Sequence, residues 1–289
     1  VSLWLAGMGP FDAVNHAMST TATGGFSTHQ DGIAWFRSSA VEYVELAFMF
    51  VSSINFTLLY LLLIKGRLRE VWRDGELRCF TLLCVGASAV IAATLYFSCG
   101  YPLERAVREA AFHVVSCQST TGFASYDFMQ WPAFTTLLIL FVMAVGACAG
   151  STTGGFKCIR LLTLVKLASG EFKRILHPHA VLPVRVGGTV ITPQVWRTLI
   201  AFSTLYVLLH LVSTLVLILT GLPLLDAVGF SISSFSNVGP AVGHLFTPLD
   251  AWDRLSDVGL WTCSFMMLAG RLEIFSLLLP LFPGFWRDN

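Results

Sequence analysis

Residues 17–28 read AMSTTATGGFST, a run of small hydroxylated side chains that ends in glycines, a phenylalanine and two more hydroxyls. The chain around it is strongly apolar: 55% of the 289 residues are hydrophobic, 12% are charged and the mean hydropathy is +0.72. Soluble domains carry about 25% charged residues. The composition therefore predicts a membrane protein. The net charge of +1 favours neither nucleic acid nor an acidic substrate.

Five apolar segments are long enough to cross a bilayer, which takes about 20 helical residues. They are Val41–Ile64, Cys79–Phe97, Trp131–Ala149, Thr198–Thr220 and Val258–Phe282. Basic residues crowd two connections between them, Lys65–Arg78 and Lys157–Arg197. The positive-inside rule makes both connections cytoplasmic. Residues 98–130 then lie on the outer side, where they are too polar to form two more spans.

An internal repeat explains the polar run. Three glycines, Gly25, Gly122 and Gly239, are each preceded without gaps by an acid thirteen residues earlier, an alanine twelve earlier and a serine six earlier. The matching residues are Asp12, Glu109 and Asp226, then Ala13, Ala110 and Ala227, then Ser19, Ser116 and Ser233. Three ungapped copies in one register predict a repeated structural unit.

Each copy predicts a short helix followed by an extended loop. The helices are expected over Asp12–Thr21, Glu109–Gln118 and Asp226–Phe235. A helix of about 10 residues is ~15 Å long, which is half of a bilayer, so the chain must enter and turn back. Irregular backbone at this depth is tolerated only inside protein or beside a watery cavity. The repeat is therefore predicted to be span, half-helix, re-entrant loop, span.

The predicted loops have the chemistry of a cation path. An acid at the helix start suits the positive end of the helix dipole, and the carbonyl end then points to the bilayer centre with about half a negative charge. The loops lack the carboxylate, histidine and cysteine ligands that Mg²⁺ or a transition metal prefers. Backbone carbonyls can replace the water around a large monovalent ion, and glycine permits the backbone angles that aim them.

The loops are therefore candidates for a selectivity filter. The filter residues are Thr23, Gly24, Gly25, Thr120, Thr121, Gly122, Asn237, Val238 and Gly239. The alternative is that small residues only let helices pack closely in the membrane. One copy does not separate the two interpretations, whereas three copies in register favour the filter.

These motifs resemble the Trk/Ktr/HKT superfamily of potassium transporters, and the bacterial Trk branch most closely. STTATGGFSTH, STTGFASYDF, SNVGPAVG, VGACAGSTTGGFKCIRLL and AGRLEIFSLLLPLFPGFWR all look like motifs of that branch, and together they cover essentially the whole chain. The resemblance implies an all-α polytopic membrane protein with four span–pore-loop–span repeats around one ion path. Only three pore loops are visible, so we expect an N-terminally truncated chain.

The expected units follow from this repeat pattern. Residues 1–66 form a partial second repeat, residues 67–170 a third repeat whose second span is interrupted, residues 171–197 a cytoplasmic connector and residues 198–289 a fourth repeat. The interruption is read from Ala147–Gly155, ACAGSTTGG, where small polar residues would break a helix. A packing kink is the alternative reading of this segment.

The resemblance implies that the interruption is a gate under the filter. The gate residues are Gly150, Ser151, Thr152, Thr153, Gly154 and Gly155. Arg271 stands in an apolar segment, where a charge is costly and by default functional or paired. Glu273 is two residues away and faces another side of a helix, so it is not the expected partner. By resemblance, Arg271 projects into the pore as part of the gate, with a snorkelling or interface arginine as the alternative.

The predicted function is potassium uptake across the bacterial inner membrane, driven by the membrane potential. An enzyme would need convergent catalytic groups, and the sequence offers no catalytic or cofactor-binding set. K⁺ is the transported ion, and no organic cofactor is expected. A Na⁺- or H⁺-coupled symporter remains the alternative. The resemblance also implies a homodimer in the lipid bilayer and a cytosolic NAD- or ATP-binding regulatory subunit of the TrkA type, with no nucleic acid partner.

Overall fold

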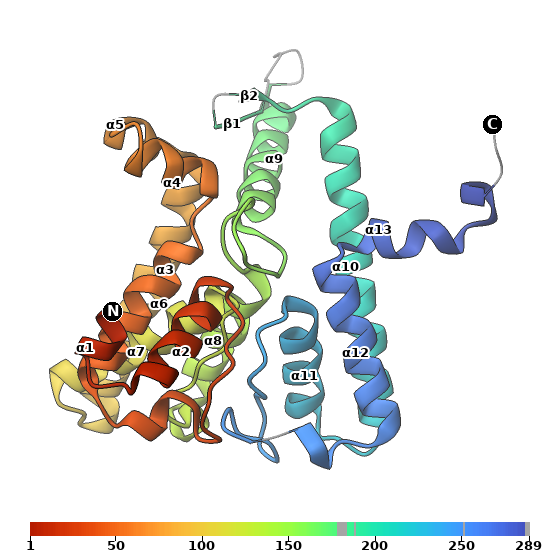
Figure 1. Ribbon diagram of the computed structural model, residues 1–289. Helices are drawn as coiled ribbons and strands as arrows, with labels where there is room; N and C mark the ends of the chain where they lie inside the picture. The colour runs from red at the N-terminus through yellow and green to blue at the C-terminus, as the bar shows by residue number, and fades with distance from the viewer. Residues whose placement is uncertain (178–183, 188, 251, 287–289) are drawn as a thin grey trace.

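The computed structural model describes residues 1–177, 184–187, 189–250 and 252–286 and is built almost wholly of helices (Figure 1). Two strands of two residues each, β1 (Arg185–Val186) and β2 (Thr189–Val190), pair as an antiparallel hairpin in the connector between α9 (Cys158–Leu176) and α10 (Pro193–Leu219). The rest of the expected connector 171–197 is partly helical, and its residues 178–183 and 188 lie outside the described residues. The all-helical expectation is met.

Among the described residues, two helices are long and apolar enough to cross a membrane without a break. The first, α6 (Gly75–Cys99), begins where the Asp74 carboxylate accepts a hydrogen bond from the Leu77 amide at 2.8 Å. It ends at Gly100, whose φ of 68° lies in the left-handed region that glycine adopts readily. The second, α10 (Pro193–Leu219), has proline in its first turn, where no backbone donor is lost.

Two further expected spans, Val41–Ile64 and Val258–Phe282, are not straight helices. The first is α3 (Ser39–Ser52) followed by α4 (Phe56–Leu63) at a bend of 106°, and the second is α12 (Asp257–Arg271) followed by α13 (Ile274–Leu278) and η4 (Leu279–Leu281) at a bend of 116°. Counting each bent pair as one span gives four candidate spans in the described part of the chain.

The α3–α4 bend has a local cause. Asn55 caps a new helix, with its side-chain oxygen accepting the Thr57 amide at 2.8 Å. Breaking a helix frees backbone groups that must find partners in a membrane. Here the Ser53 carbonyl accepts the Cys148 amide at 3.3 Å, and the Phe56 amide donates to the Gly150 carbonyl at 3.0 Å. The backbone groups freed at the bend and those freed in the interrupted span therefore form hydrogen bonds with each other.

The span expected over Trp131–Ala149 is shorter than predicted and is interrupted where the sequence indicates. Helix α8 (Ala133–Val145) stops at Gly146, and α9 (Cys158–Leu176) starts twelve residues later in the chain. The intervening loop includes all six predicted gate residues. We call residues 146–157 the intramembrane loop.

Three short helices carry the repeat. They are α2 (Pro10–Thr21), α7 (Leu103–Gln118) and α11 (Leu224–Ser236), with 12, 16 and 13 residues. The prediction of a half-length helix starting at Glu109 is wrong for α7, which begins six residues earlier because Pro102 caps it and polar residues extend its first turn. Glu109 is consequently inside the helix, where it pairs with Arg105 at 2.7 Å instead of facing the helix dipole.

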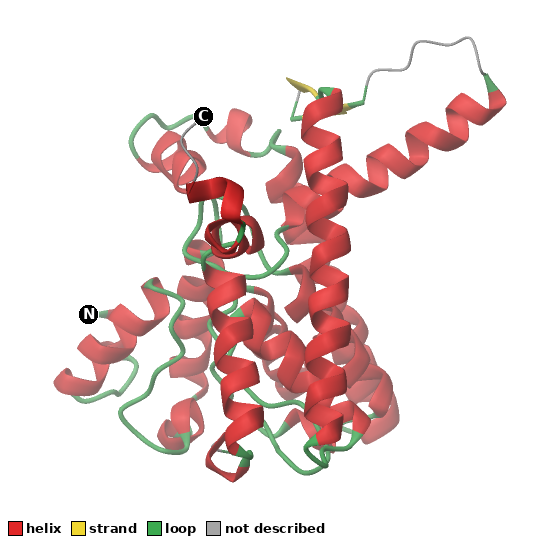
Figure 2. Ribbon diagram, turned by 90° about the vertical axis from the view of Figure 1, so that its right-hand side faces the viewer, coloured by secondary structure: helices red, strands yellow, loops and turns green. Residues whose placement is uncertain are grey.

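The remaining short elements connect these helices. They are α1 (Ser2–Leu5), η1 (Gly32–Phe36), α5 (Leu68–Val71), η2 (Phe128–Gln130), η3 (Trp252–Arg254) and η5 (Pro283–Trp286). In Figure 1, α2, α7 and α11 lie in the lower half, while α5, the end of α9 and the β hairpin lie at the top. Figure 2 shows α9 projecting away from the bundle. The two basic connections thus share one end of the molecule, as the positive-inside rule requires.

Candidate functional site

The three loops after α2, α7 and α11 have the same backbone conformation. In each loop the repeat glycine and the residue two positions before it have positive φ angles. The values are 52° and 69° for Thr23 and Gly25, 55° and 82° for Thr120 and Gly122, and 56° and 107° for Asn237 and Gly239. Successive carbonyls of a regular strand point in opposite directions. Positive φ at positions two apart breaks that alternation, which is what a loop lined by carbonyls requires.

The repeat serine ties each loop to the helix before it. The Ser19 hydroxyl accepts the Phe26 amide at 2.7 Å, and the Ser233 hydroxyl accepts the Gly239 amide at 3.1 Å. The Ser116 hydroxyl instead donates to the Phe123 carbonyl at 2.6 Å. A serine six residues before the glycine therefore fixes the end of the loop to the last turns of its helix, which explains its place in the repeat.

The backbones of neighbouring filter loops are in close contact. A Cβ atom added to Gly25 would lie 1.9 Å from the Thr121 carbonyl oxygen, and one added to Gly122 would lie 1.8 Å from the Val238 carbonyl oxygen. No side chain fits at such distances. A Cβ on Gly239 would meet no atom within 4 Å. At Gly25 and Gly122, both the backbone angle and the close approach of the next loop therefore require glycine. At Gly239 only the backbone angle favours it.

The loops meet at one cavity of about 680 Å³. Eight of the nine predicted filter residues line it, namely Thr23, Gly24, Gly25, Thr120, Gly122, Asn237, Val238 and Gly239. Thr121 is fully buried behind the cavity, with its hydroxyl 2.8 Å from the Ser119 hydroxyl. The cavity wall also includes Arg271. Carbonyls and hydroxyls suit a monovalent cation better than a bound divalent metal, and the arginine adds a positive charge to the wall.

The intramembrane loop touches all three filter loops. The Thr23 hydroxyl donates to the Thr152 carbonyl at 3.1 Å, and the Gly154 amide donates to the Thr120 hydroxyl at 2.9 Å. On the third side, a Cβ on Gly154 would lie 2.4 Å from the Ser236 carbonyl oxygen, just before the filter residue Asn237. The predicted gate residues are therefore in direct contact with the predicted filter.

Arg271 is the last residue of α12, and its side chain reaches the same loop. Its guanidinium donates to the Thr152 carbonyl at 3.0 Å, so this oxygen accepts from both Arg271 and Thr23. Glu273 is not its partner, in agreement with the sequence argument. Glu273 instead pairs with Arg160 of α9 at 2.8 Å. Arg271 thus contributes a positive charge beside the cavity, and no carboxylate of the described residues forms an ion pair with it.

Two of the three repeat acids, Asp12 and Asp226, bind the segment after the filter, a role that the dipole argument missed. Asp226 accepts hydrogen bonds from three backbone amides, those of His244, Leu245 and Phe246, at 2.9–3.2 Å. Asp12 accepts the Thr28 hydroxyl at 2.6 Å. Their fixed spacing from the glycine was the available signal. The sequence showed that spacing but did not indicate what lies opposite each carboxylate.

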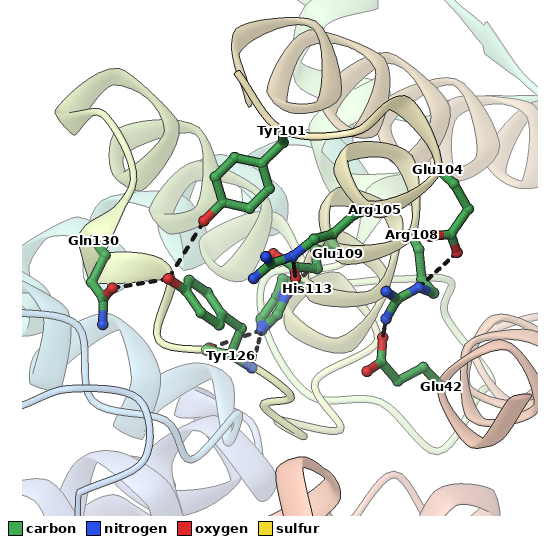
Figure 3. Close-up of polar contacts among 9 residues, drawn as sticks. All are labelled: Glu42, Tyr101, Glu104, Arg105, Arg108, Glu109, His113, Tyr126 and Gln130. Carbon is green, nitrogen blue, oxygen red and sulfur yellow. Dashed lines mark hydrogen bonds and ion pairs between the residues drawn. The ribbon is translucent and has the colours of Figure 1, made fainter. Parts of the chain in front are cut away.

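A polar cluster joins α7 to α3 and to the segment after the filter (Figure 3). Arg108 of α7 forms ion pairs with Glu42 of α3 and, at 2.8 Å, with Glu104. The buried His113 ring lies 2.8 Å from the Glu109 carbonyl and 3.1 Å from the Tyr126 carbonyl, so it links α7 to the segment after the filter. The cluster holds α7 against α3 and against that segment.

Short helices, the loops after them with one repeated pattern of positive φ angles, and a cavity that these loops share define a polytopic pore-loop membrane protein. Comparison with known proteins places the chain more narrowly. A family model described as TrkH, cation transport protein, matches residues 2–283. The chain belongs to the TrkH family.

Individual relatives agree with this assignment. The Trk system potassium uptake protein TrkH of Vibrio parahaemolyticus is 39% identical over 292 residues, which is 100% of this chain and 59% of the relative. TrkH of Escherichia coli K12 is 35% identical, with the same coverage of both chains. TrkG of the same organism is 34% identical over 98% of this chain and 58% of its own length. The chain therefore spans about three fifths of the length of these relatives.

A solved structure shows the same fold. The crystal structure of the potassium transporter TrkH from Vibrio parahaemolyticus matches with a TM-score of 0.92 at 38% sequence identity, covering 99% of this chain and 61% of that chain. The names of the relatives describe transport rather than catalysis, in line with the expectation that the chain is not an enzyme. Nothing in those names favours the alternative of a Na⁺- or H⁺-coupled symporter.

Proposed function

We propose that this protein takes up K⁺ across the bacterial inner membrane through the filter loops, with K⁺ as the transported ion. The observation that carries the proposal is the convergence of three loops of equal backbone conformation on one cavity. Carbonyl and hydroxyl oxygens there can replace the hydration water of a large monovalent cation. Each K⁺ that enters a cell gains about 2.3 kcal/mol per 100 mV of membrane potential, so uptake needs no chemical step.

The proposed filter is formed by residues 23–25, 120–122 and 237–239, and the proposed gate by Gly150–Gly155 with Arg271. Two features support the gate. The intramembrane loop bonds to Thr23 and Thr120 of the filter, and Arg271 bonds to the same loop. In this arrangement the loop closes the path below the filter, and the guanidinium repels a resting cation. Opening requires the loop to leave these partners.

The four units expected from the sequence, with boundaries at residues 66, 170 and 197, stay a prediction, as do a homodimer and a regulatory subunit of the TrkA type that binds NAD or ATP. The basic connections Lys65–Arg78 and Lys157–Arg197 are the proposed docking surface for that subunit, because they share one end of the molecule. Charge attraction would speed the encounter with an acidic partner.

The test is ion flux at a fixed voltage. The protein, expressed as its gene encodes it, is reconstituted in liposomes, and K⁺ and Na⁺ entry are followed with and without a proton or sodium gradient. We expect K⁺ to enter faster than Na⁺ and the gradients to leave the K⁺ flux unchanged. Equal fluxes of both ions would contradict the filter, and a flux that needs either gradient would contradict uptake driven by voltage alone.

A further inference from the structure

A buried carboxylate outside the filter contacts both ends of the intramembrane loop. Glu76 lies in the first turn of α6, and its side chain is 7% exposed. Its Oε1 atom accepts the Ala149 amide at 2.6 Å and the Ile159 amide at 3.1 Å. Ala149 lies on the entering side of the loop, and Ile159 lies in the first turn of α9 beyond it. One oxygen thus connects the two sides.

Both amides need an acceptor that the loop itself does not supply. The Ile159 amide is in the first turn of a helix, where backbone donors have no partner within the helix. The Ala149 amide is in irregular backbone at membrane depth, where an unpaired donor costs several kcal/mol. A carboxylate at the positive end of α9 also interacts favourably with the helix dipole. Glu76 therefore acts as a cap delivered from another helix.

Backbone hydrogen bonds join the two ends of the intramembrane loop and fix its conformation there. The Lys157 amide donates to the Val145 carbonyl at 2.8 Å, and the Cys158 amide donates to the Ala147 carbonyl at 2.9 Å, so the two sides pair with each other. Lys157 has a φ of 79°, which is unfavourable for a residue with a side chain. Such angles persist only where surrounding contacts fix them. Glu76 supplies two of those contacts.

Glu76 also lies at the inner end of the membrane region. Two residues earlier, Asp74 caps α6, and α5 (Leu68–Val71) precedes it in the basic connection. Val71 is 5% exposed and packs into the same core as Cys148 and Cys158. A force on the basic connection would reach Glu76 directly through the start of α6.

We propose that Glu76 is the positioning residue that keeps the intramembrane loop closed, by holding its entering and leaving sides on one carboxylate at the base of α6. The inference rests on the proposed function of the loop as a gate. Release of the two amides from Glu76 frees the loop to leave the filter. The filter itself is untouched by this release, so opening changes the amount of flux and not its selectivity.

The test compares three variants of the protein in liposomes. Glu76→Met keeps most of the buried volume but removes the acceptor, Glu76→Gln keeps a neutral oxygen that can accept both amides, and Glu70→Ala removes an exposed glutamate that pairs with Arg67 at the surface, both side chains being 55% exposed. Two readouts are taken: K⁺ leak without any partner, and labelling of Cys148 and Cys158 by N-ethylmaleimide, resolved by peptide mass spectrometry. Both residues are 0% exposed; Cys148 lies in the intramembrane loop and Cys158 directly follows it.

We expect Glu76→Met to raise both the leak and the labelling rate about tenfold, because hydrogen bonds to a charged group contribute more than neutral ones. Glu76→Gln should restore both values to within about threefold of the unsubstituted protein. Glu70→Ala should change neither. The K⁺ to Na⁺ permeability ratio should stay constant in all three variants.

The other outcomes test two roles separately: that of Glu76 in holding the loop, which we call the clamp, and that of the loop as a gate. Unchanged labelling in Glu76→Met overturns the clamp, and so does equally fast labelling in Glu76→Gln, because the acceptor is kept there. A fall in K⁺ selectivity in Glu76→Met also overturns it, since the residue would then support the filter. Faster labelling with an unchanged leak supports the clamp and contradicts the gate of the proposed function. If Glu76→Met is not recovered folded, the labelling and leak of Glu76→Gln still decide the proposal.

Discussion

The tetrapeptide Ser-Thr-Thr-Gly occurs twice, at residues 119–122 in the filter and at residues 151–154 in the intramembrane loop. Locally the two copies are alike. The hydroxyls of the first serine and second threonine lie 2.8 Å apart in the filter and 2.7 Å apart in the loop. Each serine hydroxyl also donates to the carbonyl three residues earlier, at 3.1 Å and 2.6 Å. The sequence thus determines the same small turn in both places.

The surroundings of the two copies differ. The filter copy follows α7, is buried at its first three residues, and has positive φ at Thr120 and Gly122. The loop copy interrupts a span, is only half-buried at its first two residues, and has its positive angle later, at Gly155. Under the proposed function, the helix that aims its carbonyl end at the first copy makes that copy part of the ion path. The second copy, which is held by contacts from other segments, is then the one that moves.

The largest effect is expected from a side chain at Gly122. Gly122→Ser should lower the K⁺ to Na⁺ permeability ratio about thirtyfold, because Cβ would meet the Val238 carbonyl and strain of about 2 kcal/mol accompanies positive φ. Reversal potentials measure the ratio. The matched change in the other copy, Gly154→Ser, should alter the size of the flux and leave the ratio near its original value. A larger shift in Gly154→Ser would reverse the assignment of filter and gate.

The second effect concerns the bond between the copies. Thr120→Val removes the acceptor of the Gly154 amide, and an unpaired buried donor costs about 1–3 kcal/mol. We expect a resting K⁺ leak about ten times higher. Thr152→Val is the control, because its hydroxyl makes only a 3.3 Å bond to the Ser52 carbonyl, and it should raise the leak less than about twofold. Equal leaks in both variants would show that this contact does not hold the loop.

The third effect concerns charge beside the loop copy. Arg271→Ala should raise the resting K⁺ conductance about fivefold, since a nearby positive charge costs a cation about 1 kcal/mol even in water. Arg271→Gln keeps a donor for the Thr152 carbonyl and loses the charge. If Gln behaves like Ala, the charge forms the barrier; if Gln behaves like Arg, the hydrogen bond does. Unchanged conductance in both variants would remove Arg271 from the gate.

The smallest effect is expected where the copies are alike. Ser119→Ala and Ser151→Ala each remove the shared turn bonds, and each should lower stability by about 1 kcal/mol. Thermal unfolding in detergent measures the change. Similar losses in both variants would support equal local structure, whereas a much larger loss in one would show that the surroundings also govern the turn.

The repeat could be predicted in detail because its positions are fixed by contacts within one unit. The serine binds the loop that follows it, and the glycine φ is local, so their spacing is visible in the sequence. The bends could not be predicted. Hydropathy registers composition over a window and does not register that Asn55 starts a new helix. The early start of α7 was not predicted either. The acid that the three copies share placed the expected helix start at Glu109, although Pro102 directly precedes the observed start.

Contacts between segments that are distant in the chain could not be predicted from the sequence either. Glu76 lies 73 residues from Ala149 and 83 residues from Ile159, and no periodicity links them. The chain has seven cysteines, each standing alone in the sequence. Five are buried, but Cys79 is half-buried and Cys99 is exposed at the outer end of α6, where lipid-facing positions need no partner. Burial on one side of a span depends on which neighbours pack there.

The Thr152 carbonyl has a consequence for how such a path would open. This one oxygen accepts from Thr23, 129 residues away in the chain, and from Arg271, 119 residues away. Both hydrogen bonds end on one atom, so a movement of the loop that takes this oxygen away from one donor also takes it away from the other. Flux would then switch between two levels instead of rising gradually, and single-channel records would show abrupt steps.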